Sequence, residues 1–259
     1  MNYLFTICGR AGSKGLENKN VSDFNGIPLV YYTLAAIKLV IERLNEAGHK
    51  CEVVLNTDSE ELVRIVNNQS KLPVLHIERE EKLAGDRVAK VTVIKDTLLK
   101  SQKHWEIEFD YVIDLDITSP LRTVKNVMDA IRKKEENKQA DVVYSLSKAR
   151  KNPYFNMAKR VGNFYEKVIH AKYISRQETP EVFDMNASIY VYEPKALICK
   201  EASTFFNSKA DAIIMKDTAV LDIDCEEDKN LMEILAHYYF FEKFDDYKEV
   251  YKYAKVLGV

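Results

Sequence analysis

The sequence is poor in the residues that mark exported, disulfide-rich or zinc-stabilised proteins. Its 259 residues include 4 Cys, 8 Gly and 6 Pro, and the cysteines are far apart, with no Cys-x-x-Cys motif or Cys/His cluster. We therefore expect neither disulfides nor structural zinc. The first apolar run turns polar at Gly9, and no run approaches the ~20 apolar residues of a membrane span. We expect no secretory leader, no membrane association and a reduced, cytoplasmic location.

An excess of charge of either sign is also missing. Lys and Arg number 38 and Asp and Glu number 40, so the formal net charge is −2. Such a chain lacks the strong field that attracts nucleic acid or an anionic membrane. Apolar residues make up 46% of the sequence, which is enough for a substantial core at this length. We expect one domain over residues 1–259 that binds a small charged ligand through local groups.

What the sequence does contain, in its first half, is an alternation of short β-rich runs with amphipathic runs. This alternation is typical of an α/β fold, in which helices cover both faces of a mainly parallel sheet. The expected strands are YLFTIC, EVVLNT, PVLHI, YVIDLDI and DVVYSL, and the expected helices cover residues 29–47, a run from 60, 88–104 and 124–138.

The pattern changes after Lys148. Residues 152–173 combine Asn-Pro, Val-Gly-Asn and aromatic runs, which predict an antiparallel hairpin within an inserted arm at about 150–182. Regular structure is expected to resume with the strands SIYVYEP, AIIMK and VLDID, and to end with helices over 226–243 and 247–255.

The first expected strand leads directly into the loop GRAGSKG, which begins at Gly9. Its glycines let the backbone approach a polyphosphate, and Arg10 and Lys14 supply positive charge. The spacing fits neither the dinucleotide motif G-x-G-x-x-G nor the P-loop motif G-x-x-x-x-G-K-[ST]. An ordinary glycine turn with solvated cations is the alternative interpretation.

Two pairs of aspartates lie in or after expected strands. Asp222 and Asp224 share one face of VLDID, so their carboxylates can converge on one hard cation; they could instead be solvated or support the N-terminus of the next helix. Asp114 and Asp116 share one face of YVIDLDI near its carboxyl end, where α/β proteins place ligands. Asp116 could be a metal ligand or a base, or could only position the TSPLR turn.

Six ordered motifs, spread over nearly the whole chain, resemble the acylneuraminate cytidylyltransferases, the CMP-sialic acid synthetase family. They are GRAGSKGLENKN from Gly9, REEKLAGD from Arg79, TSPLR from Thr118, SRQETP from Ser175, NASIY from Asn186 and DID from Asp222. The resemblance implies a three-layer, Rossmann-like nucleotidyltransferase fold with a β-hairpin dimerisation arm. It also implies a homodimer that transfers CMP from CTP to the anomeric hydroxyl of an acidic nine-carbon sugar and releases pyrophosphate.

The resemblance further implies a role for each matching residue. The residues implied for CTP are Arg10, Ser13, Lys14, Lys19, Asn20 and Arg79, those for the sugar are Arg176, Gln177 and Asn186, and those for Mg²⁺ are Asp222 and Asp224. Arg10, Lys14 and Asp116 join the two metal-binding aspartates in the expected catalytic set. An arginine such as Arg176 can grip a carboxylate through two parallel hydrogen bonds, although a surface arginine without a partner is the alternative there.

Two departures from the family motifs concern the sugar. Asp116 stands where many relatives have the glutamine of LQPTSPLR, and DMNASIY, residues 184–190, stands where many have RPNGAIY. With RKNPYFN, these features resemble the branch that acts on legionaminic acid. The alternatives are a CMP-N-acetylneuraminate, pseudaminate or Kdo synthetase, a sugar-1-phosphate nucleotidyltransferase, and a catalytically silent nucleotide-binding regulatory protein.

Overall fold

The computed structural model describes residues 1–259 except 13–15, 17, 208, 217–221, 244 and 259. A central sheet contains the strands β1 Asn2–Cys8, β4 Lys50–Thr57, β5 Leu75–Glu78, β6 Tyr111–Leu115, β7 Val142–Lys148, β10 Phe183–Tyr192 and β11 Ala210–Met215. Their order is β11-β7-β10-β6-β1-β4-β5. Only β10 runs antiparallel to its neighbours in this sheet, β6 and β7. The predicted mainly parallel α/β sheet is confirmed.

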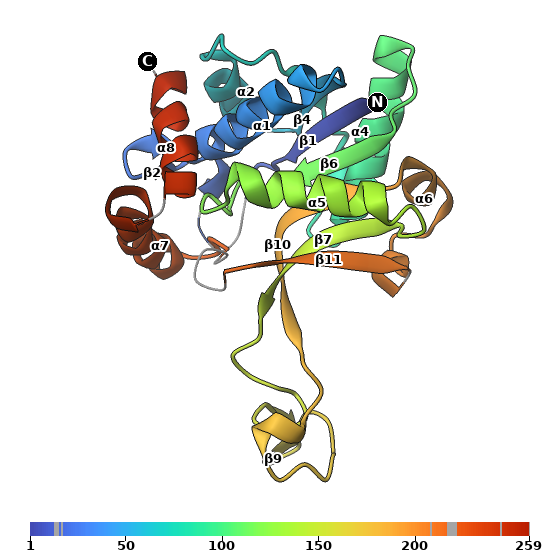
Figure 1. The fold of residues 1–259 in the computed structure, drawn as a ribbon, viewed down its shortest axis with the longest axis vertical. Coiled ribbons are helices and arrows are strands. Elements are labelled where there is room, and N and C mark those ends of the chain that lie inside the picture. Colours follow the sequence, from blue (N-terminus) through green and yellow to red (C-terminus); the bar gives the residue numbers. More distant parts are fainter. Residues whose placement is uncertain (13–15, 17, 208, 217–221, 244, 259) are drawn as a thin grey trace.

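Helices cover both faces of the sheet (Figure 1). One hydrophobic cluster joins the sheet to α1 Leu29–Glu46, α2 Glu60–Asn67, α5 Val124–Glu136, α7 Glu226–Tyr238 and α8 Asp245–Leu257. A second cluster joins it to α4 Lys90–Trp105 and α6 Pro194–Cys199. The short elements are α3 Glu81–Ala84, the strand pair β2 Asp23–Phe24 and β3 Ile27–Pro28, and the helical turns η1 Lys19–Val21 and η3 Phe205–Asn207. The three-layer arrangement therefore matches the sequence pattern.

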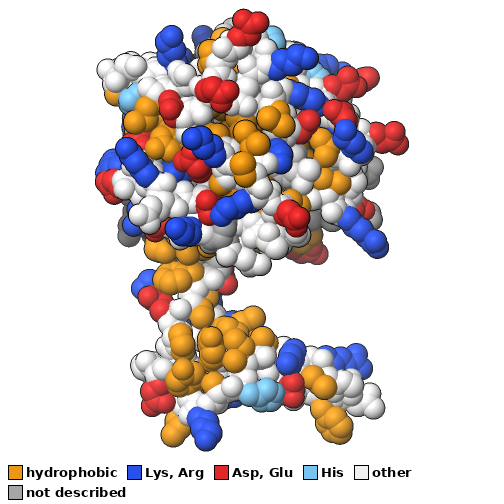
Figure 2. Space-filling view, turned by 90° about the vertical axis from the view of Figure 1, so that its right-hand side faces the viewer, with side chains coloured by type: hydrophobic (Ala, Val, Ile, Leu, Met, Phe, Trp, Pro, Cys, Tyr) orange, Lys and Arg blue, Asp and Glu red, His pale blue; other side chains and the backbone are white. Residues whose placement is uncertain are grey.

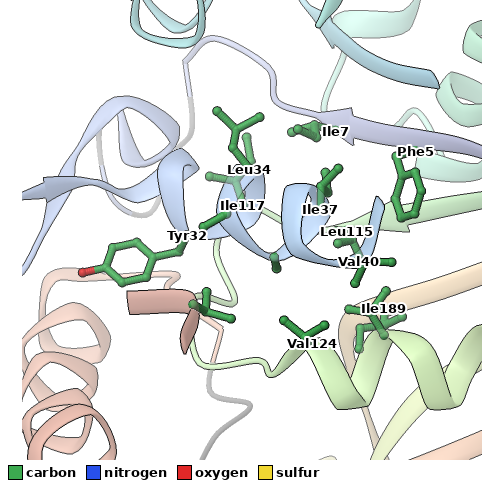
Figure 3. Close-up of a cluster of buried hydrophobic side chains, with 14 of the residues drawn as sticks. Phe5, Ile7, Tyr32, Leu34, Ile37, Val40, Leu115, Ile117, Val124 and Ile189 are labelled. Atoms are coloured by element: carbon green, nitrogen blue, oxygen red, sulfur yellow. The ribbon is translucent and has the colours of Figure 1, made fainter. Parts of the chain in front are cut away.

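Strand β1 lies between β6 and β4 and is buried on both faces. Phe5 and Ile7 belong to the cluster beneath α1, whereas Leu4 belongs to the cluster beneath α4. Figure 3 shows Phe5 and Ile7 in the same interior as Ile37 and Val40 of α1. Each such buried side chain contributes on the order of 1.5–3 kcal/mol, so the end of β1, from which the glycine loop departs, is firmly positioned.

The C-terminal region departs from the expected elements. The described part of VLDID, residues 222–224, lies outside any strand, so the predicted strand is wrong there. The Ile223 N–H donates to the Thr118 carbonyl at 3.2 Å, which ties the segment to a loop instead of to a neighbouring strand. The long helix expected over 226–243 ends at Tyr238, and the π-helical turn η5 Tyr239–Lys243 follows, where Phe240 stacks on Tyr32 with ring centroids 5.8 Å apart.

The arm, defined as residues 149–182, leaves the sheet between β7 and β10 and extends away from it (Figure 1). It carries the antiparallel pair β8 Ala158–Val161 and β9 Phe164–Lys167, so the predicted hairpin is present, and the turn η2 Arg176–Glu178. Figure 2 shows hydrophobic side chains gathered on the arm. Phe164 is 80% exposed and Ile174 is 88% exposed. The arm thus leaves a large apolar area in solvent.

Candidate active site

A cavity of about 210 Å³ lies at the carboxyl ends of β1, β5 and β6. This is the edge at which α/β sheets bind ligands. Its polar lining consists of Arg10, Lys19, Asn20, Arg79, Asp86, Lys90 and Asp116. Five of these residues, all except Asp86 and Lys90, are candidates from the sequence. The fold therefore brings together side chains that lie up to about a hundred residues apart.

The described part of the glycine loop is held closely against its surroundings. A Cβ atom at Gly9 would lie 2.6 Å from Leu62 Cδ2 and 2.9 Å from Ile117 Cδ1, so only glycine fits there. The Asn20 side-chain amide donates to the Arg10 carbonyl at 3.1 Å, and the Arg10 side chain forms an ion pair with Asp86. Ser13 and Lys14, two of the candidates for binding CTP, lie outside the described residues.

Arg79 is only 7% exposed and is fixed by the end of β4. Its Nε donates to Asn56 Oδ1 at 2.8 Å, and its Nη2 donates to the Asn56 carbonyl at 2.9 Å. A guanidinium group has five N–H donors, so donors remain for a ligand in the cavity. Arg79 can therefore offer directed hydrogen bonds without first having to be ordered.

Lys90 contacts both aspartates at the carboxyl end of β6, Asp114 and Asp116. Its Nζ lies 2.8 Å from Asp114 Oδ2 and 2.6 Å from Asp116 Oδ2. The other oxygens of both carboxylates are also occupied: Asp114 Oδ1 accepts from the Thr6 hydroxyl at 2.8 Å, and Asp116 Oδ1 accepts from the Thr118 hydroxyl at 2.9 Å. The three ionisable groups thus form one fixed unit.

The charges of this unit control its protonation. Burial opposes ionisation of Asp116, but the charge and hydrogen bond of Lys90 outweigh burial and hold the pKa of Asp116 well below its usual range. Burial likewise opposes the charge on Lys90, but Asp114 and Asp116 raise the pKa of Lys90 well above its usual value. A general base needs a pKa near the working pH. The contacts with Lys90 and Thr118 therefore keep Asp116 in the ionised form of a hydrogen-bond acceptor.

Lys90 is a site residue that the sequence analysis missed. It is the first residue of α4, and the residue before it, Ala89, makes no side-chain cap. A positive charge at a helix N-terminus is unfavourable for the helix dipole. That mismatch is the sequence signal by which Lys90 could have been found, because it indicates that another interaction holds the lysine there.

The arginine of TSPLR has a structural position. Arg122 is 1% exposed, its Nη1 donates to the Ser188 carbonyl at 2.6 Å, and its Nη2 donates to Thr33 Oγ1 at 2.8 Å and to the Asp116 carbonyl. It therefore locks the turn that carries Asp116 against β10 and α1.

Asp222 and Asp224 lie in the segment between β11 and α7. Lys19 Nζ lies 3.0 Å from Asp224 Oδ1 and 3.1 Å from the Ile223 carbonyl. Asp222 Oδ1 is buried and has no hydrogen-bond partner among the described residues, and burial together with the charge of Asp116 raises the pKa of Asp222. Within the described part of the chain, no three His, Cys, Asp or Glu side chains are grouped to hold a metal ion. The carboxylates of Asp222 and Asp224 thus lie near the cavity residue Lys19, and Asp222 has one oxygen without a hydrogen-bond donor among the described residues.

The three sugar candidates are not in the cavity lining. Asn186 is 7% exposed; its Oδ1 accepts from the Ser145 hydroxyl at 2.5 Å, and its Nδ2 has no partner among the described residues. Ala187, the next residue, has a left-handed φ of 56° within an irregular stretch of β10. Arg176 and Gln177 are exposed in the arm, where Arg176 Nη2 donates to the Ala149 carbonyl at 3.2 Å.

Comparison with known proteins gives consistent results. A family profile described as "Cytidylyltransferase" matches residues 4–253. The post-translational flagellin modification protein B of Campylobacter coli is 32% identical over 232 residues, which cover 90% of this chain and 94% of that protein. The CMP-N,N'-diacetyllegionaminic acid synthase of Campylobacter jejuni is 33% identical over 232 residues, with the same two coverages.

The fold is similar to that of solved structures. CMP:2-keto-3-deoxy-manno-octonic acid synthetase, solved in complex with CTP, aligns with a TM-score of 0.59 at 15% identity, covering 91% of this chain and 98% of that chain. At this identity the similarity concerns the fold alone. None of the described helices is long and apolar enough to cross a membrane.

Proposed function

The chain belongs to the cytidylyltransferase family, and from this premise we propose that it transfers CMP from CTP to the anomeric hydroxyl of a nonulosonic acid, an acidic nine-carbon sugar. The observation that carries the proposal is the cavity at the sheet edge, where Arg10, Lys19, Asn20 and Arg79 meet. Three cations and an amide suit a ligand that combines a polyphosphate with a hydrogen-bonding base. Location in the cytoplasm, where CTP is made, is part of the proposal.

In this reaction the sugar hydroxyl oxygen forms a bond to the α-phosphorus of CTP, and the bond from that phosphorus to the leaving oxygen breaks. The hydroxyl proton passes to solvent or a nearby base, and pyrophosphate leaves. The protein's contribution is positioning and charge neutralisation. Arg10 and Lys19 would neutralise phosphate oxygens, while Asn20 and the remaining donors of Arg79 would hold the cytosine.

The two aspartates beside the cavity fit a magnesium ion. Mg²⁺ is usually held by one or two carboxylates together with substrate phosphates and water, and Asp222 Oδ1 is a buried oxygen without a partner among the described residues. Asp222 and Asp224 would hold the ion, which when bound offsets phosphate charge and lowers the pKa of the attacking hydroxyl. Lys19, which contacts Asp224 at 3.0 Å, would remain close enough to contact the phosphates as well.

Legionaminic acid is the sugar we favour. The 33% identity to a protein named CMP-N,N'-diacetyllegionaminic acid synthase extends over 94% of that protein. Asn186 offers a buried Nδ2 that lacks an acceptor among the described residues, and a sugar oxygen would complete its hydrogen bonding. Arg176 would pair with the sugar carboxylate.

Arg176 lies on the arm rather than in the cavity lining, so we propose that the arm completes the sugar site of a second copy of the chain in a homodimer. The exposed Phe164 and Ile174 supply apolar area for that contact. A closed dimer of this kind would contain two equivalent sites, each built from both subunits.

The test is pyrophosphate release from the purified protein with CTP, Mg²⁺ and one acid at a time: N,N'-diacetyllegionaminic, N-acetylneuraminic, pseudaminic or Kdo. We expect release to require both CTP and a nonulosonic acid, with the highest kcat/KM for the legionaminic acid. A higher kcat/KM for another acid would change the sugar but not the reaction. No release with any acid, despite measurable CTP binding, would instead support the silent nucleotide-binding alternative.

A further inference from the structure

Lys90 lines the cavity and contacts two carboxylates at the carboxyl end of β6. It lies 2.8 Å from Asp114 and 2.6 Å from Asp116. Asp114 is fully buried, whereas the Lys90 side chain is 33% exposed and borders the cavity. A lysine ammonium has three N–H donors, so one remains after these two contacts. Lys90 therefore stands between a buried negative charge and the space in which a ligand binds.

Without Lys90 the cavity would present an unfavourable charge to a nucleoside triphosphate. Asp116 lines the cavity and would lose its ion-pair partner, as would the buried Asp114. Arg122 donates to the backbone carbonyl of Asp116 instead of to its carboxylate. Charges that are partly removed from water interact over several ångströms with little screening.

We propose that Lys90 is a substrate-positioning residue that acts together with Asp116. The Lys90 ammonium group offsets the negative charge of the carboxylates at the carboxyl end of β6, and this allows the anionic CTP to bind in the cavity. This inference rests on the proposed function, because it names the residue that adapts the CTP site to Asp116. The loss of Lys90 therefore harms CTP binding mainly by leaving Asp116 charged. Removing the charge of Asp116 as well restores binding.

A buried lysine elsewhere in the chain provides a matched control. Lys134 is fully buried, lies 3.0 Å from Glu193, and sits over the ring of Tyr111 at 5.0 Å. Tyr111 is the first residue of β6 and Asp116 follows its last residue. Lys134 therefore lies at the amino end of β6, whereas the cavity lies at its carboxyl end. Its replacement breaks a comparable ion pair without touching the CTP site.

The experiment measures the CTP dissociation constant by calorimetry, together with KM, kcat and the thermal melting temperature. The variants are Lys90→Met, Asp116→Asn, the double variant Lys90→Met/Asp116→Asn, and Lys134→Met. We expect Lys90→Met to weaken CTP binding by about tenfold or more, the scale of a nearby unscreened charge. The double variant should bind CTP within about threefold of the wild type, and Lys134→Met should lower only the melting temperature.

Three results would overturn the inference: unchanged CTP binding in Lys90→Met, a double variant as weak as Lys90→Met, or an equal loss of CTP binding in Lys134→Met. If Lys90→Met does not fold, the double variant decides, because it should fold and bind CTP. If the wild-type protein binds no CTP, the proposed function itself is contradicted. If the wild-type protein binds CTP but Lys90→Met and Lys90→Met/Asp116→Asn bind it equally, only the role of Lys90 is contradicted.

Discussion

The cavity edge and the arm hold their functional side chains in opposite ways. At the cavity, Arg79 is 7% exposed and makes two hydrogen bonds to Asn56. In the arm, Arg176 is exposed and its Nη2 donates to the Ala149 carbonyl. Groups fixed before binding lose little entropy when the ligand arrives. Arg79 is thus fixed at the cavity by its own chain, whereas Arg176 leaves most of its donors exposed on the arm.

The two halves of the proposed reaction therefore depend on different parts of the structure. The proposed CTP half lies at the carboxyl ends of β1 and β6, which are buried on both faces. The proposed sugar half would rely on the irregular stretch of β10 and on the arm. Variants at the cavity should therefore act within one subunit, and variants in the arm should act through assembly or through the sugar.

The largest effect should come from the cavity side, at Asp224. We expect Asp224→Asn to lower kcat by at least about a hundredfold, because it removes a charge that would act on the transition state through the proposed Mg²⁺. Pyrophosphate release at saturating substrates measures this. Glu226→Gln, in the first turn of α7, is the control and should keep near-normal turnover. Near-normal turnover in Asp224→Asn would remove this residue from the mechanism.

The next effect should come from Arg176 in the arm. We expect Arg176→Ala to lower kcat/KM for the sugar by about tenfold or more, the scale of a lost charge-assisted hydrogen bond, with unchanged CTP binding. Arg160→Ala, whose arginine Nε contacts the Gly162 carbonyl within the hairpin, should show neither change. Weaker CTP binding in Arg176→Ala would contradict the division between cavity and arm.

Mixed dimers of two variants would show whether each proposed site combines both subunits. The Arg176→Ala and Asp224→Asn proteins are mixed in equal amounts and allowed to exchange subunits, so half of the dimers contain one subunit of each kind. If each site combines the cavity of one subunit with the arm of the other, every mixed dimer has one intact site. The mixture should then regain about one quarter of wild-type activity. No recovery from a mixture that demonstrably contains mixed dimers would place both residues in the site of a single subunit.

A change of assembly should follow from the apolar arm surface. We expect Ile174→Asp to weaken the dimer, because it places a charge in a desolvated contact, and light scattering after gel filtration would show a lower molar mass. Ile234→Asp is the control: Ile234 is 70% exposed on α7 and lies outside the arm. Equal effects of the two variants, or none, would argue against the arm as the dimer contact.

The smallest effect should be a gain in stability at Ala187. Its φ of 56° costs an L-residue with a Cβ atom about 1–2 kcal/mol, so Ala187→Gly should raise the free energy of unfolding by about 0.5–1 kcal/mol after the entropy of glycine is counted. Urea unfolding measures this. Ala236→Gly, within helix α7, should instead lower stability by about 1 kcal/mol. A loss at both positions would contradict the left-handed conformation of Ala187.

Sequence patterns predicted most of the fold because alternation and helical periodicity reflect burial on sheet faces. They located Arg10, Asn20 and Arg79 through motifs at strand ends. They failed at VLDID, because the Ile223 N–H donates to the loop residue Thr118 instead of to a neighbouring strand. They also missed Lys90, because its partners are more than 20 residues away and only the fold brings them within 2.8 Å.

The transfer of CMP is tested directly by following the phosphorus atoms of CTP during one reaction with N,N'-diacetyllegionaminic acid and Mg²⁺. With CTP labelled at the α-phosphate, we expect the label to appear in a product that also contains the sugar. With CTP labelled at the γ-phosphate, we expect the label to appear in pyrophosphate at the same rate. An α-label that stays in CTP, or that appears only in free CMP or CDP with no sugar attached, would contradict the proposed transfer.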